Sequence, residues 1–153
     1  NFDEMEAILK LDTKGHVSLI KDIIVTDVGE IISASDDKTI RVWDIETGKE
    51  KRKILGQIGA GSEGKIYAIA LSPDKKYLAV GGFLGKFGGE GKNVGRIRIY
   101  NYQTGELEKV LYGHKDAIND LSFSLDEKYL ISGSFDKTAK IWNVKNNFRL
   151  VDT

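Results

Sequence analysis

Residues 31–44 of the chain read IISASDDKTIRVWD, and residues 130–143 read LISGSFDKTAKIWN. A Gly-His pair precedes each stretch, at residues 15–16 and 113–114. The first His lies 27 residues before its Trp and the second lies 28 residues before its Trp, so one unit occurs twice with a single-residue deletion. Self-similarity at a fixed spacing is typical of repeat architectures, in which each repeat is one supersecondary unit.

A third, degraded copy lies between these two. Residues 66–82 (IYAIALSPDKKYLAVGG) align without a gap to residues 118–134 (INDLSFSLDEKYLISGS). Further along, RIRIYN at 96–101 falls on TAKIWN at 138–143, after an insertion near residues 85–94. The repeating unit is therefore roughly 42–57 residues long, which suits a propeller blade better than a shorter solenoid repeat.

Each unit predicts four short strands. Alternating apolar and polar residues mark half-buried strands, and polar turns ending near Gly separate them. The expected outermost strands are 7–11, 50–55, 107–112 and 148–151. No stretch carries a sustained period of about 3.6 residues with helix caps, so we expect no substantial helix.

Four short strands form a small twisted sheet with two apolar faces, and such a sheet cannot bury both faces alone. Sheets stacked face to face around an axis cover those faces and leave only short edges. We therefore predict an all-β protein built from β-propeller blades, each of four antiparallel strands. A closed ring needs roughly four to eight blades, so three units predict an open arc of about three blades.

These units resemble the WD-repeat family of β-propellers. The matching residues are Gly15, His16, Ser33, Asp37, Trp43 and Asp44 in the first unit, and Gly113, His114, Ser132, Asp136, Trp142 and Asn143 in the third. The middle unit departs from the pattern, with Ser62 in place of His, Val80 in place of Ser, Leu84 or Val94 in place of Asp, and Tyr100 in place of Trp. The resemblance implies a blade there whose side-chain network is lost.

On this resemblance, residues 1–153 form a partial WD-repeat propeller. The expected parts are an outer strand of an upstream blade (6–12), blade 1 (13–55), a degenerate blade 2 (56–112) with a Gly-rich insert (85–94), and blade 3 (113–153). In the family a repeat begins with the outer strand of the preceding blade, so we expect the natural protein to be longer. The alternative is that two or more copies of the chain assemble into one ring.

Each full unit contains Ser, His and Asp, the residue types of a hydrolase triad. The family resemblance implies a structural network instead, in which the Trp indole bonds Ser, Ser bonds His, and His bonds Asp. Buried Trp, His and Asp all need hydrogen-bond partners, and two identical active sites 99 residues apart would be unusual. We predict structural tetrads of His16, Ser33, Asp37 and Trp43 and of His114, Ser132, Asp136 and Trp142, with no catalytic residue and no enzyme activity.

The charge balance and the absence of Cys exclude several classes of partner and site. The 23 Lys and Arg residues balance the 23 Asp and Glu residues, so nothing in the net charge attracts nucleic acid or a membrane surface, and we expect neither partner. Cys is absent, which excludes disulfides and Cys–zinc sites. We expect no metal and no cofactor: the two His residues belong to different units, and Asn93 stands where a phosphate loop needs Ser or Thr.

Loops on a rigid scaffold carry function, and the resemblance implies that partners dock on the face bearing the loops that lead into the innermost strands. Positions one, three and five after the His, and the position before the tetrad Asp, point to that face. The expected partner-binding residues are Val17, Leu19, Lys21, Asp36, Glu63, Lys65, Tyr67, Phe83, Lys115, Ala117, Asn119 and Phe135. Phe83 and Phe135 stand out because exposed aromatics anchor interfaces, although each could instead pack on a neighbouring loop.

The leading hypothesis is a non-catalytic, cytoplasmic scaffold that binds protein or peptide partners on the propeller face. Self-association through open blade faces is a further expectation. The alternative is a regulatory or targeting propeller segment of a larger multidomain protein that carries an effector enzyme, such as a protease, kinase or ligase, outside this chain. Fold alone does not decide between them.

Overall fold

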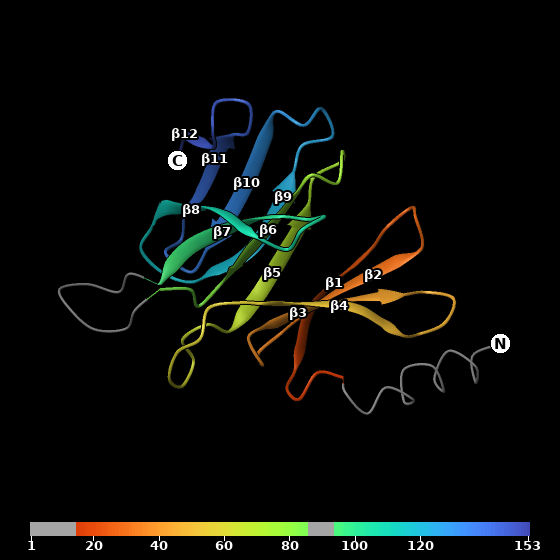
Figure 1. Cartoon of the computed structure of the whole chain (residues 1–153). Coiled ribbons are helices and arrows are strands. Elements are labelled where there is room, and N and C mark those ends of the chain that lie inside the picture. The colour runs from red at the N-terminus through yellow and green to blue at the C-terminus, as the bar shows by residue number, and fades with distance from the viewer. Residues whose placement is uncertain (1–14, 86–93) are drawn as a thin grey trace.

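The computed structural model describes residues 15–85 and 94–153. Within these ranges the chain is all-β, with three separate sheets of four antiparallel strands and no helix (Figure 1). The predicted fold class is confirmed, and the sheets form an open arrangement. The expected strand at 7–11 and most of the insert lie outside the described residues.

The strand order in every sheet follows the chain, so each blade is a simple meander. Blade 1 contains β1 (Ile20–Val25), β2 (Glu30–Ser35), β3 (Thr39–Asp44) and β4 (Glu50–Leu55). Blade 2 contains β5 (Ile66–Leu71), β6 (Tyr77–Gly82), β7 (Gly95–Asn101) and β8 (Leu107–His114). Blade 3 contains β9 (Ile118–Phe123), β10 (Tyr129–Ser134), β11 (Ala139–Asn143) and β12 (Arg149–Asp152).

Two outer strands differ from the sequence expectation. Strand β12 begins at Arg149 rather than at residue 148, because Phe148 has a φ of 55° and belongs to the preceding turn. Its ring is buried and packs edge-on against Tyr77, with 5.2 Å between the ring centroids. Strand β8 runs on past residue 112 to His114, which pairs with Gly95 of β7. Both differences arise from contacts between strands or blades that the local pattern does not contain.

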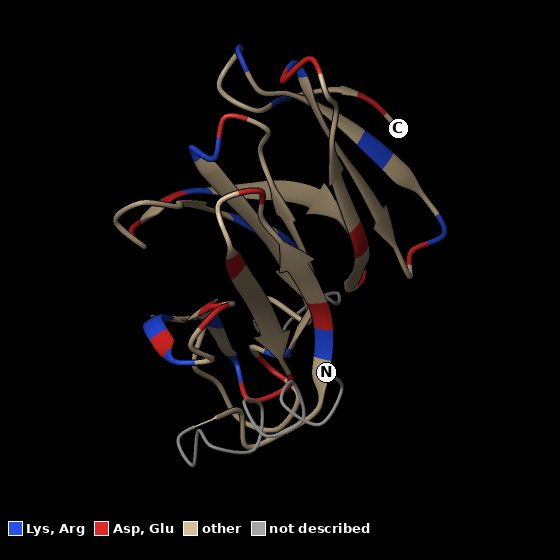
Figure 2. Cartoon of the chain, turned by 90° about the vertical axis from the view of Figure 1, so that its right-hand side faces the viewer, with Lys and Arg blue, Asp and Glu red and all other residues tan. Residues whose placement is uncertain are grey.

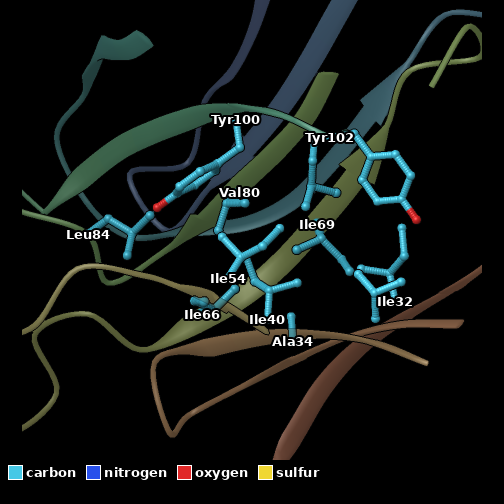
Figure 3. Packing of buried hydrophobic residues seen from close by; sticks show 12 residues of the cluster. Ile32, Ala34, Ile40, Ile54, Ile66, Ile69, Val80, Leu84, Tyr100 and Tyr102 are labelled. Atoms are coloured by element: carbon cyan, nitrogen blue, oxygen red, sulfur yellow. The ribbon is translucent and has the colours of Figure 1, made fainter. Parts of the chain in front are cut away.

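Blade 2 lies between the other two blades (Figure 1). Apolar side chains fill both junctions. We call the face of a blade toward the preceding blade its upstream face, and the opposite face its downstream face. Ile32, Ile40 and Val42 on the downstream face of blade 1 are fully buried against blade 2. Figure 3 shows Ile32 and Ile40 in this junction. Burying one such side chain contributes about 1.5–3 kcal/mol, so these junctions hold the blades together.

A polar contact also ties blade 1 to blade 2. Tyr102 directly follows β7, and its hydroxyl donates a hydrogen bond of 2.5 Å to Glu30 Oε2 on β2. The Arg52 guanidinium lies 4.4 Å from the centroid of the same ring. Burial, together with the hydrogen bond to Glu30, raises the pKa of Tyr102 to about 12. The phenol is therefore a neutral donor at ordinary pH.

Candidate functional site

In blade 3 a hydrogen-bonded chain links the four expected residues. The Trp142 indole N–H donates to Ser132 Oγ at 2.9 Å, His114 Nε2 lies 2.8 Å from the same oxygen, and His114 Nδ1 lies 2.8 Å from Asp136 Oδ2. Because an indole N–H can only donate, Ser132 Oγ is the acceptor of the bond from Trp142, and a His114 ring that carries its proton on Nδ1, facing Asp136, accepts the Ser132 hydroxyl proton at Nε2. Ser132 is 0% exposed, so its oxygen is enclosed and already bonded on both sides.

Blade 1 repeats this geometry. The distances are 2.8 Å from Trp43 Nε1 to Ser33 Oγ, 2.7 Å from His16 Nε2 to Ser33 Oγ, and 2.8 Å from His16 Nδ1 to Asp37 Oδ2. The His16 side chain is only 2% exposed. The two networks differ in how exposed the indole is, because Trp43 is half-buried and Trp142 is buried. They contain the same hydrogen bonds, but the residues that cover the indole differ.

The carboxylate of each network also bonds the backbone. Asp136 Oδ2 accepts the Lys115 amide at 2.9 Å, and Asp37 Oδ2 accepts the Val17 amide at 3.1 Å. Burial raises the pKa of Asp136, but hydrogen bonds from Thr138, the Lys115 amide and His114 outweigh it and hold the pKa well below its usual range. The pKa of Asp37 is lowered by equivalent contacts against the same effect of burial. Each ionised carboxylate therefore pins the loop that follows the His.

In blade 2 an apolar cluster takes the place of the network. Val80, Leu84, Val94 and Tyr100 are all buried, and Figure 3 shows Val80, Leu84 and Tyr100 beside Ile54 and Ile66. The Leu84 amide donates to the Val94 carbonyl at 2.9 Å, which joins the two ends of the insert.

One backbone hydrogen bond recurs in all three blades and places the predicted partner positions. The amide before the tetrad Asp position donates to the carbonyl three residues after the His position. The pairs are Asp36 to Leu19 at 2.9 Å, Phe83 to Lys65 at 2.9 Å, and Phe135 to Ala117 at 3.0 Å. We call the edge that carries these loops the loop face.

The twelve predicted residues differ in how accessible they are. Six are exposed: Val17, Leu19, Lys21, Lys115, Asn119 and Phe135. Five are half-buried: Asp36, Glu63, Lys65, Tyr67 and Phe83. Ala117 is buried, and this corrects the expectation for its side chain. Its carbonyl accepts the Phe135 amide at 3.0 Å, and the residue is only 3% exposed.

Four of these residues from two blades meet at one point on the loop face. Asp36 Oδ2 lies 3.8 Å from Lys21 Nζ and 3.8 Å from Lys65 Nζ. The Lys21 ammonium lies 6.0 Å from the centroid of the Tyr67 ring. Burial and the charge of Asp36 raise the pKa of Tyr67. Sequence spacing placed these side chains on one face but gave no indication that they pair between blades.

Sequence reasoning did not include Ile58, an exposed apolar residue of the loop face. Ile58 lies on the segment between β4 and β5, which leads into the innermost strand of blade 2, and its side chain is exposed. The signal was available, because Ile58 is an isolated apolar residue among Gly and polar residues in a loop of the predicted class.

In residues 15–85 and 94–153, no group of three or more His, Cys, Asp or Glu residues is placed to hold a metal ion. Over the same ranges no helix is long and apolar enough to cross a membrane. A cavity of about 320 Å³ opens at the opposite end of blades 2 and 3, lined by Ser72, Asp74, Lys76, Tyr77, Glu127, Val144 and Lys145.

Stacked four-stranded blades, two of them with an indole–hydroxyl–imidazole–carboxylate network on the same face, define a β-propeller architecture. Residues 8–44 and 105–143 match the family described as WD domain, G-beta repeat. The chain is a member of the WD-repeat β-propeller family, as the sequence resemblance predicted.

Its relatives and a solved structure agree. The chain is 32% identical to the ribosome biogenesis protein WDR12 homolog of Trichoplax adhaerens, covering 87% of this chain and 28% of that protein. It is 27% identical to Protein DOA1 of Saccharomyces cerevisiae, covering 88% of this chain and 17% of that protein. The crystal structure of the RRP9 WD40 repeats matches with a TM-score of 0.74 and 30% identity, over 90% of this chain and 39% of that one. The chain thus spans well under half the length of these matches.

Proposed function

We propose that the chain is a non-catalytic scaffold that binds protein or peptide partners through its loop face. The observation that carries the proposal is a group of exposed apolar side chains on the loops of all three blades: Val17, Leu19, Ile58 and Phe135. Apolar side chains gathered on one face favour a protein interaction site, and an exposed aromatic such as Phe135 is a suitable anchor.

Rigid loops support this proposal. The tetrad carboxylates bond the Val17 and Lys115 amides directly, and the Phe135 amide is bonded to the Ala117 carbonyl. A loop that is already ordered loses less conformational entropy when a partner binds. The polar networks therefore serve binding by presenting the loop face in one conformation.

The same networks argue against hydrolysis. A nucleophilic Ser must present its oxygen to a substrate carbonyl, whereas Ser132 Oγ is buried and accepts the Trp142 indole N–H. Ser33 Oγ is held in the same way by Trp43.

Charge supports a protein partner over nucleic acid or a membrane. Lys and Arg alternate with Asp and Glu along the strands and turns (Figure 2), and the formal net charge is zero. Binding to a phosphate backbone depends on a concentration of positive charge. A cytoplasmic location stays a prediction.

The second candidate function is a regulatory or targeting segment of a larger multidomain protein. The small share of each curated relative that this chain covers favours it. Both candidates use the loop face for binding, and a catalytic domain in the same reading frame would select the second.

The test is affinity capture from an extract of the source cells, using the tagged chain and two variants. The double variant Leu19→Asp/Phe135→Asp places charge on the loop face, and we expect it to lose the partners that the wild type retains. The control is Leu125→Asp, which alters a still more exposed apolar residue in the β9–β10 turn at the opposite end of blade 3. If the double variant retains the same partners as the control, the loop face is not the binding surface.

A further inference from the structure

Blade 1 presents an upstream face that has no cover among the described residues. In blades 2 and 3 the equivalent face is buried against the preceding blade. The buried residues are Ile69, Leu78 and Tyr100 in blade 2, and Leu121, Leu130 and Trp142 in blade 3. The strand registers place Ile23, Ile31 and Trp43 at those positions in blade 1. Ile23 is 56% exposed, whereas its equivalent Ile69 is 3% exposed. The face has the composition of a blade junction without the neighbouring blade.

Blade 3 presents the complementary surface. Val42 and Ile99 occupy equivalent positions on the downstream faces of blades 1 and 2, and both are 0% exposed. The equivalent residue in blade 3 is Ile141, which is 36% exposed. Ile131, one strand further in, is exposed as well. This face also has the composition of a junction, here of the half that receives the next blade.

The side chain of Asp120 indicates which kind of surface fits the downstream face of blade 3. In blade 1, Asp22 Oδ1 accepts the Ile23 amide at 2.9 Å, and Oδ2 accepts the Ile69 amide of blade 2 at 2.9 Å. Asp120 is the equivalent residue of blade 3, and its Oδ1 accepts the Leu121 amide at 2.9 Å in the same way. No described residue donates to Asp120 Oδ2. The open face of blade 3 thus carries an acceptor placed for the innermost strand of another blade.

We propose that the downstream face of blade 3 docks on the upstream face of blade 1 in a second copy of the chain. Both junctions inside the molecule pair a downstream face with an upstream face, so the contact between copies is head to tail. At that contact Asp120 Oδ2 would meet the Ile23 amide, in a bond shared with Asp22. The described residues of two copies supply six sheets, and a head-to-tail contact gives a finite ring where its rotation closes.

Sedimentation velocity on the 153-residue chain tests the proposal, using two variants with a charge on one face each. Val25→Glu alters the upstream face of blade 1, and Ile141→Glu alters the downstream face of blade 3; both side chains are exposed within the monomer. We expect the wild type to reach at least twice the monomer mass of 17.0 kDa. Each variant alone should stay monomeric, because its altered face blocks the only pairing available between identical copies.

The mixture of the two variants gives the sharpest result. The Val25→Glu chain retains an intact blade 3 face and the Ile141→Glu chain retains an intact blade 1 face, so one junction can form. We expect an equimolar mixture to give a one-to-one complex although neither variant associates alone. A monomeric wild type, or a single variant that still dimerises, overturns the proposal. Far-UV circular dichroism and melting temperature establish that both variants are folded.

The docking is independent of the proposed function, because it uses blade faces rather than the loop face. The variant Leu19→Asp/Phe135→Asp should therefore assemble like the wild type while losing its partners. In this variant, loss of assembly contradicts the docking alone, and retention of the partners contradicts the scaffold proposal alone.

Discussion

At the scale of residues, burial and bonding decide what Ser, His and Asp do in this chain. Ser132 is 0% exposed and its Oγ accepts the Trp142 indole N–H, so the oxygen is not presented to a substrate. The sequence alone gave the residue types and their spacing, and these also fit a triad. The indole as a fourth member favours the structural interpretation, because Trp142 and Ser132 are both buried and a nucleophilic oxygen must reach a substrate carbonyl.

The networks should make stability depend on pH in the acid range. The pKa of Asp136 is lowered in the folded chain, so its contribution to the free energy of unfolding is complete above the ordinary Asp value of 3.8 and is lost as the pH falls below it. We predict that Asp136→Asn makes urea unfolding less dependent on pH in that range than it is in the wild type. Asp152→Asn, which removes an exposed carboxylate outside the networks, is the control. An unchanged pH dependence in Asp136→Asn would contradict the assignment.

At the scale of elements, blade 2 shows that the strand pattern persists without the tetrad. Its four strands form with Val80 and Tyr100 at the Ser and Trp positions. Both side chains lie in the junction with blade 1, so apolar packing stabilises this blade where hydrogen bonds stabilise the others. The sequence predicted the blade correctly from alternation and turns, since those depend on backbone geometry rather than on the network.

The substitution Val80→Thr tests whether apolar packing stabilises blade 2 in place of the hydrogen-bonded network. Val80→Thr keeps the shape of the side chain and buries an oxygen among apolar atoms. We predict a loss of about 1–3 kcal/mol in the free energy of unfolding. The same substitution at exposed Val25 is the control, and we expect it to change the free energy by less than about 0.5 kcal/mol. Denaturant unfolding of both variants makes the comparison; equal effects would show that the Val80 position accepts polarity.

At the scale of the whole molecule, repetition made most of the fold predictable. Aligned repeats give three blades, the order of their strands and the tetrad members, because each blade is a local structure. Contacts between blades were not predictable in this way. Phe148 of blade 3 packs on Tyr77 of blade 2, and no pattern within one repeat encodes the neighbouring blade.

The two tetrads illustrate the same limit. Trp43 and Trp142 occupy equivalent positions and make the same hydrogen bond. One is half-buried and the other is buried, because blade 2 covers the upstream face of blade 3 and no described residues cover that of blade 1. The exposure of a residue in a repeat protein thus depends on the position of its repeat in the stack.

The central claim is that the chain acts by binding and that its Ser–His–Asp networks are architecture. The most direct measurement is intact-mass spectrometry of the wild type and His114→Ala after treatment with a fluorophosphonate, which labels activated serines. We predict that the wild type stays at 17.0 kDa with no adduct, and that His114→Ala melts at a lower temperature than the wild type. An adduct on Ser132 or Ser33 of the wild type, with the Ser132 label absent from His114→Ala, would contradict the account.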